Sequence, residues 1–144
     1  MPIDHSLRVL VVDDFATMVQ IVRKLLGQLG FENVDDARNG EAALEKLRYR
    51  KYDLVICDWN MEPMTGYELL LRVREDRNLA STPFIMITGE SKPDHVIAAR
   101  KAGVSNYIVK PFTADALKGK IDTIFGDVSV AAKVAGEAQL VQIR

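Results

Sequence analysis

Charged and hydroxyl side chains stand directly after four short apolar runs of this 144-residue chain. The runs and the residues that follow them are 7–12 with Asp13 and Asp14, 52–57 with Asp58, 84–87 with Thr88, and 107–109 with Lys110. Short runs rich in valine and isoleucine predict buried parallel strands. In an open α/β sheet the functional crevice lies outside the carboxyl ends of the strands. We therefore expect three carboxylates, a hydroxyl and an ammonium around one pocket.

This combination of residue types predicts phosphoryl chemistry assisted by a metal ion. Asp13, Asp14 and Asp58 would repel one another unless a cation lay among them, and hard oxygen ligands suit Mg²⁺. One carboxylate could then attack a phosphoryl group and form an aspartyl-phosphate. Lys110 and Thr88 are suitable groups to contact the phosphoryl oxygens. Each residue has an ordinary explanation on its own, such as a helix N-cap for Asp14, but four coincidences at one sheet edge favour the joint hypothesis.

The segments between these runs predict the elements that must position the residues. Apolar residues recur at helical spacing in five segments, which are 15–29, 42–47, 67–74, 93–102 and 117–125. Gly30, Gly103 and Gly126 are expected helix ends, and 34–37 is a fifth strand, predicted more weakly. Strict alternation of five strands and five helices predicts a doubly wound α/β fold, with a parallel sheet and helices on both faces.

Composition and charge restrict the class of protein. The hydrophobic fraction of 48% and the charged fraction of 27% are those of a globular chain of one domain. The net charge of -1 favours neither nucleic acid nor an anionic membrane as partner. A single cysteine, Cys57, excludes a disulfide framework and fits a reducing compartment. With no signal peptide pattern and no apolar run of spanning length, we expect a soluble cytoplasmic protein without membrane insertion.

The motifs resemble the receiver domain of two-component response regulators, and among them the single-domain, CheY-like regulators. The residues that carry the resemblance are Asp13-Asp14, Asp58-Trp59-Asn60-Met61, Thr88, Tyr107 and Lys110-Pro111. The resemblance covers about residues 7 to 126, so we expect a receiver domain over 1–126 and a C-terminal extension of undecided structure over 127–144. It leaves no room for a separate output domain, and it implies the flavodoxin-like strand order 2-1-3-4-5.

The resemblance also implies a role for each matching residue. Asp58 would accept a phosphoryl group from the phosphohistidine of a histidine kinase or of its phosphotransfer domain. Asp13, Asp14, Asp58 and the backbone carbonyl of Asn60 would bind Mg²⁺, and Lys110 would contact the phosphoryl group. Thr88 and Tyr107 would act as switch residues. Asn60 and Glu90 would tune the lifetime of the phosphoryl group. A downstream target would bind the face made by the fourth helix, fifth strand and fifth helix. The chain would then be a signalling module with self-directed phosphoryl chemistry and not an enzyme.

Several alternatives and departures from the family pattern stay open. The domain could instead be a phosphate sink or a phosphorelay intermediate. An aspartate-nucleophile phosphatase is disfavoured because Asn60 stands where such enzymes have a second aspartate, and a flavin carrier because Asp13-Asp14 would repel a phosphate. Glu62 separates Met61 from Pro63, where the family commonly has proline directly, and Gly89 replaces the common alanine after the switch residue.

Overall fold

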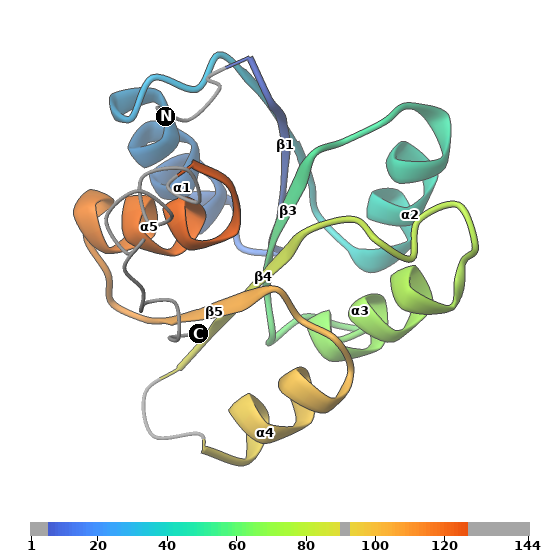
Figure 1. Ribbon diagram of the computed structural model, residues 1–144. Coiled ribbons are helices and arrows are strands. Elements are labelled where there is room, and N and C mark those ends of the chain that lie inside the picture. Colours follow the sequence, from blue (N-terminus) through green and yellow to red (C-terminus); the bar gives the residue numbers. More distant parts are fainter. Residues whose placement is uncertain (1–5, 90–92, 127–144) are drawn as a thin grey trace, which may run out of the picture.

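The computed structural model describes residues 6–89 and 93–126 of the chain and shows an α/β fold (Figure 1). The strands are β1 (Arg8–Val12), β2 (Asn33–Ala37), β3 (Leu54–Asp58), β4 (Phe84–Thr88) and β5 (Asn106–Val109). The helices are α1 (Ala16–Gln28), α2 (Gly40–Tyr49), α3 (Gly66–Glu75), α4 (Pro93–Lys101) and α5 (Ala114–Ile121), and a π-helical turn, η1 (Asp122–Gly126), continues α5. The five strands pair in parallel in the order β2-β1-β3-β4-β5. The predicted fold class and the implied strand order are therefore confirmed.

Helices cover both faces of the sheet because side chains on the central strands alternate between two cores. Figure 1 shows α1 and α5 on one side of the sheet and α2 and α3 on the other, with α4 near the β5 edge. On β1, Val9 and Val11 pack with α1 and α5, whereas Leu10 and Val12 pack with α2 and α3. β1, β3 and β4 are buried on both faces, which is why their sequences are continuous apolar runs instead of alternating ones.

Parallel pairing brings the carboxyl ends of the strands to one edge. Val12 pairs with Cys57, Asp58 with Ile87, and Thr88 with Val109. The residues that follow β1, end β3, end β4 and follow β5 consequently lie at neighbouring positions along this edge. The expected crevice is therefore formed by the ends of four different runs of the chain.

Two apolar residues do not lie where helical spacing placed them. Phe15, the first apolar position of the predicted helical segment 15–29, is the N-cap residue of α1 and is 63% exposed. Ile97 on α4 is 54% exposed, and Ala99 is the buried residue of that helix. Gly30 and Gly103 do end their helices, with φ of 98° and 91°, a conformation that favours glycine.

Parts of the predictions lie outside the described residues. Glu90 and the whole extension 127–144 fall there, so their expected roles stay predictions. Within residues 6–89 and 93–126, none of the helices has the length and apolar character needed to cross a membrane.

Candidate functional site

The site is built around two buried carboxyl groups at the ends of adjacent strands. Asp13 directly follows β1, and its N–H donates to the carbonyl of Ala37, which extends the pairing with β2 by one residue. Asp58 is the last residue of β3. Each of the two aspartates is only 3% exposed. Strand pairing therefore fixes the backbone of both aspartates at this edge. Aspartate side chains are seldom buried in this way unless they are paired, so their burial here points to a functional site.

Lys110 completes a charged group with these acids. Its Nζ lies 2.9 Å from Oδ1 of Asp58, across the gap between β3 and the end of β5. The backbone N–H of Lys110 donates to the carbonyl of Thr88, so the lysine follows the strand ladder directly. Its charge and that of Asp58 both act on the Asp13 carboxyl, as does the charge of Asp14. The structure thus brings Asp13, Asp58 and Lys110 together, with the exposed Asp14 nearby.

Burial makes Asp13 an unusually weak acid. Desolvation raises the pKa of the Asp13 carboxyl from 3.8 to about 6, and the neighbouring negative charge of Asp58 adds to this rise. The N–H of Phe15 donates to Oδ1 of Asp13 at 3.0 Å and lowers the pKa, but by less than burial raises it. Perturbed carboxyl groups of this kind are typical of functional sites.

Two carboxylate oxygens of the site lack hydrogen bonds to the described residues. Oδ2 of Asp13 and Oδ1 of Asp58 are both buried and accept no hydrogen bond there, although Oδ1 of Asp58 has its ion pair with Lys110. No group of three or more acidic, histidine or cysteine side chains among residues 6–89 and 93–126 is arranged as a metal cluster. Mg²⁺ needs only one or two carboxylates because it keeps several waters. The unpartnered Oδ2 of Asp13, beside the Asp58 carboxylate, therefore fits this cation.

Thr88 lies at the end of β4, next to the acids but with a different partner. It is buried, and its Oγ1 lies 3.3 Å from Nδ1 of His95 on α4. The His95 ring in turn stacks on Trp59, the residue after Asp58. Sequence reasoning missed His95. The available signal was its position in the first turn of the helix after β4, which begins at the same sheet edge.

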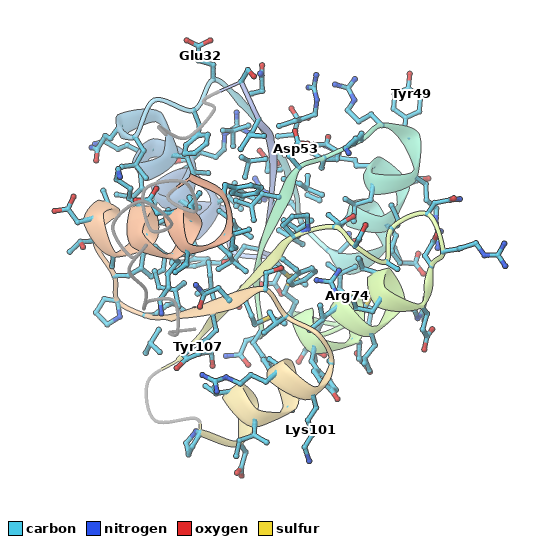
Figure 2. The ribbon with its side chains drawn as sticks, in the orientation of Figure 1. Glu32, Tyr49, Asp53, Arg74, Lys101 and Tyr107 are labelled. Carbon is cyan, nitrogen blue, oxygen red and sulfur yellow. The ribbon has the colours of Figure 1, made fainter. Side chains whose placement is uncertain are left out.

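Tyr107 is placed on β5, away from the carboxyl groups. Its ring lies 4.9 Å from Nζ of Lys120 on α5 and 5.8 Å from the guanidinium of Arg100 on α4. In Figure 2 it lies between β5 and α4. Both distances allow cation–π attraction, so the tyrosine connects the fourth helix, fifth strand and fifth helix named in the predicted partner face.

The segment between β3 and α3 holds the other side of the site. Asn60 is exposed, and the role of its backbone carbonyl as a metal ligand stays a prediction. The segment is fixed at its far end by a capping box, in which Thr65 and Glu68 each bond the other's backbone N–H. Cys57 is fully buried, and burial raises its pKa well above the usual range, as for a cysteine of the core.

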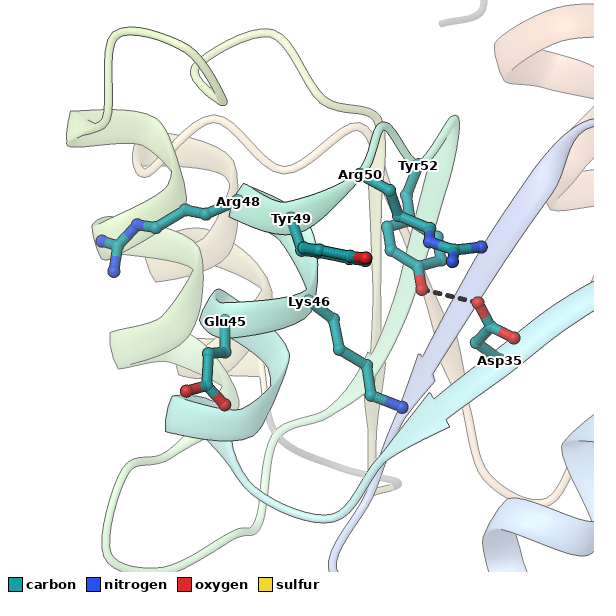
Figure 3. A pocket seen from close by; sticks show the side chains of 7 residues that line it. All are labelled: Asp35, Glu45, Lys46, Arg48, Tyr49, Arg50 and Tyr52. Atoms are coloured by element: carbon teal, nitrogen blue, oxygen red, sulfur yellow. Dashed lines mark hydrogen bonds between the residues drawn. The ribbon is translucent and has the colours of Figure 1, made fainter.

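A groove of about 750 Å³ lies elsewhere on the molecule, at the end of α2 (Figure 3). Its lining residues are Asp35, Glu45, Lys46, Arg48, Tyr49, Arg50 and Tyr52. The Tyr52 hydroxyl donates to Asp35 at 2.6 Å, and Arg48 pairs with Asp76 at 3.3 Å. Because it contains both signs of charge and some of its groups already bond one another, the groove selects no class of ligand. None of the predicted site residues lines it.

Comparison with known proteins agrees with this geometry. The family model described as "Response regulator receiver domain" matches residues 9–122. The chain is 47% identical over 123 residues to the chemotaxis protein CheY-3 of Vibrio cholerae, an alignment covering 85% of this chain and 95% of the relative. It is also 47% identical over 123 residues to the chemotaxis protein CheY of Pseudomonas aeruginosa, covering 85% and 99%. The structure of CheY4 of Vibrio cholerae matches with a TM-score of 0.77 and 32% identity, over 83% of this chain and 99% of that one.

The chain therefore belongs to the response regulator receiver domain family. More narrowly, it is of the CheY type, as its fold and relatives agree. Proteins of this type are signalling modules that interact with histidine kinases and downstream targets. Receiver domains of the family generally use Mg²⁺.

Proposed function

We propose that this protein takes a phosphoryl group from the phosphohistidine of a histidine kinase, or of its phosphotransfer domain, onto Asp58 and then changes its affinity for a protein partner. The observation that supports this most is the buried Asp58 carboxylate with Lys110 Nζ at 2.9 Å, beside the orphaned oxygen of Asp13. A potential nucleophile, a cation and an oxygen ligand for a metal lie together at the edge of the sheet where the carboxyl ends of the strands meet.

The transfer requires positioning and charge neutralisation more than acid–base chemistry. An oxygen of Asp58 attacks the phosphorus, the P–N bond breaks, and its electron pair returns to the kinase imidazole. Lys110 moves from the carboxylate to the phosphoryl oxygens and neutralises their charge. Asp13 and Asp14 would hold Mg²⁺, directly or through water, together with Asp58 and the Asn60 carbonyl, and the bound ion would neutralise further phosphoryl charge.

The module also removes its own phosphoryl group. Water attacks the phosphorus, the bond to Asp58 oxygen breaks, and inorganic phosphate leaves with the carboxylate restored. Asn60 and Glu90, which stand two residues after Asp58 and Thr88 in the sequence, tune the lifetime, as the matching positions do in the family. This chemistry acts on the protein itself, so it is not turnover of a separate substrate.

The output is carried by the face made of α4, β5 and α5. Thr88 moves toward the phosphoryl group and Tyr107 changes its rotamer, so a local charge event biases a two-state surface. The face offers exposed apolar side chains to a partner, namely Ile97 on α4 and Val109 on β5. Arg100 and Lys120 flank Tyr107 there, which suits a target with apolar and acidic groups.

We place the protein in chemotaxis-type signalling in the cytoplasm, because its relatives in Vibrio cholerae and Pseudomonas aeruginosa are named chemotaxis proteins. Residues 1–126 form the receiver domain in this proposal, and 127–144 are an extension with a separate role. A phosphate sink or relay intermediate remains the alternative output. A pull-down with beryllofluoride-loaded protein decides between them, since a sink retains kinase components and no target that depends on loading.

Trp59 emission tests the proposal directly, because the indole is adjacent to Asp58. Beryllofluoride with Mg²⁺ should shift or quench the emission of the wild type, and Asp58→Asn should abolish the response. Asp115→Asn makes the same chemical change at an exposed site in the first turn of α5 and should leave the response intact. An unchanged wild-type spectrum, together with no phosphoprotein by mass after acetyl phosphate treatment, would refute the phosphoacceptor role. Multiple turnover of p-nitrophenyl phosphate would instead support the phosphatase.

A further inference from the structure

Three aromatic rings from different elements form a continuous stack beside the site. Trp59, after β3, stacks on Tyr67 of α3 with ring centroids 5.2 Å apart and planes 14° apart. His95 of α4 also stacks on Trp59, with ring centroids 3.8 Å apart and ring planes 4° apart. Nearly parallel rings at this distance make extensive contact. The plane of the His95 imidazole is therefore held by the stack.

Within this plane, Nδ1 of His95 faces the Thr88 hydroxyl. The distance to Thr88 Oγ1 is 3.3 Å, and the threonine side chain is 3% exposed. Threonine has restricted χ1 rotamers because it is branched at Cβ. A hydroxyl also has a single proton to donate. The contact with His95 consequently favours one rotamer of Thr88, whichever of the two groups carries the shared proton.

We propose that His95 is a positioning residue that holds the Thr88 hydroxyl in its resting position on the α4 side of the site. This inference rests on the proposed function, in which Thr88 turns toward a phosphoryl group on Asp58. To make that turn, the hydroxyl gives up its contact with His95. The contact thus opposes switching.

The strength of this opposition follows from an ordinary hydrogen bond. Losing one such bond changes an equilibrium by about two- to tenfold. A variant without the Nδ1 contact should therefore switch more easily by this factor. A variant that keeps a polar δ-position atom should switch as the wild type does. His95 differs here from the residues that touch the phosphoryl group, whose loss should impair the response instead.

Two substitutions separate the ring from its nitrogen. His95→Phe keeps a flat ring for Trp59 but has no nitrogen, whereas His95→Asn keeps a polar atom at the δ position and loses the ring. The χ1 angle of Thr88 is measured by three-bond NMR couplings to its methyl carbon, on the full chain without Mg²⁺ or phosphoryl donor. The wild type and His95→Asn should show one rotamer, and His95→Phe should show averaged couplings. Wild-type couplings in His95→Phe, with the amide spectrum showing a folded protein, would overturn the inference.

A second measurement follows the switching itself. Beryllofluoride affinity in the presence of Mg²⁺, measured by ¹⁹F NMR, should increase about two- to tenfold in His95→Phe and should stay unchanged in His95→Asn. Equal or weaker affinity in His95→Phe would contradict the role of His95. If the wild type binds no beryllofluoride, the proposed function fails, and the coupling measurement alone then decides whether His95 positions Thr88.

Discussion

Asp13 shows at the residue scale how burial and function oppose each other. Its carboxyl is desolvated, lies near Asp58 and has its pKa raised to about 6. Since this value is above the ordinary 3.8, the folded protein binds the proton more tightly than the unfolded chain does. The resulting stabilisation is fully present below pH about 4 and is lost as the pH rises through about 6. A cation that takes the deprotonated carboxylate would remove this cost.

Replacing Asp13 by an uncharged isostere should therefore stabilise the metal-free protein at neutral pH. For Asp13→Asn we expect a free energy of unfolding higher than wild type by about 1 to 3 kcal/mol at pH 8, with little difference at pH 4. The amide oxygen can still accept the N–H of Phe15. Urea unfolding at several pH values with EDTA measures the effect. The exposed Asp14→Asn serves as control, and parallel pH profiles for wild type and Asp13→Asn would contradict the expectation.

At the scale of elements, the segment from β3 to α3 depends on the absence of a side chain at Gly66. This residue starts α3, and its N–H donates to the Trp59 carbonyl at 2.9 Å. A Cβ there would collide with the carbonyl oxygen of Asp58 and lie 3.0 Å from Cα of Trp59. The helix start can approach the end of β3 this closely only with glycine.

The same glycine-to-alanine change should have opposite effects at two helix positions. Gly66→Ala should lower the free energy of unfolding by about 1 to 3 kcal/mol, because backbone atoms must move to admit the methyl group. Gly119 on α5 has no described atom within 4 Å of its Cβ position. Gly119→Ala should raise stability by about 0.5 to 1 kcal/mol through helix propensity. Chemical denaturation of both variants tests this, and equal effects would show that the close approach does not matter.

Across the whole molecule, Arg74 joins segments that are distant along the chain. Its guanidinium donates to the carbonyls of Gly103 at 2.9 Å, Ala80 at 3.1 Å and Thr82 at 2.7 Å. These carbonyls belong to the connections before β4 and after α4, and Figure 2 shows Arg74 on α3 between them. Burial lowers the pKa of Arg74 from its ordinary value. The planar fork of arginine reaches several acceptors in a fixed geometry, which the single nitrogen of a lysine does not reproduce.

Arg74→Lys should consequently destabilise the fold although it preserves the charge. We expect a loss of about 2 kcal/mol from unsatisfied, partly buried carbonyls. Arg72→Lys, on the exposed side of the same helix, should change stability by less than about 0.5 kcal/mol. Thermal and urea unfolding of the pair provide the comparison. A similar loss in both variants would mean that Arg74 contributes only a surface charge.

The sequence by itself determined the fold class and the sheet edge at which the charged residues meet. Asp13, Asp58 and Lys110 follow apolar runs, and the carboxyl ends of parallel strands must meet, so their proximity could be predicted before any coordinates. Helix boundaries followed from glycine and proline for a similar reason, since these residues act locally. The position of Phe15 as an N-cap residue could not be predicted, because periodicity cannot distinguish an N-cap from the first inward residue of a helix.

Only the tertiary structure decided which side chains contact across elements. The stack of Tyr67, Trp59 and His95 joins α3, the residue after β3, and α4, and no spacing along the chain encodes it. The raised pKa of Asp13 and the three bonds of Arg74 depend equally on what surrounds each group. Strand order and periodicity arise from backbone pairing and the alternation of apolar residues, which a sequence displays directly. Rotamers, desolvation and ring contacts arise from packing between distant segments, and these exist only once the chain is folded.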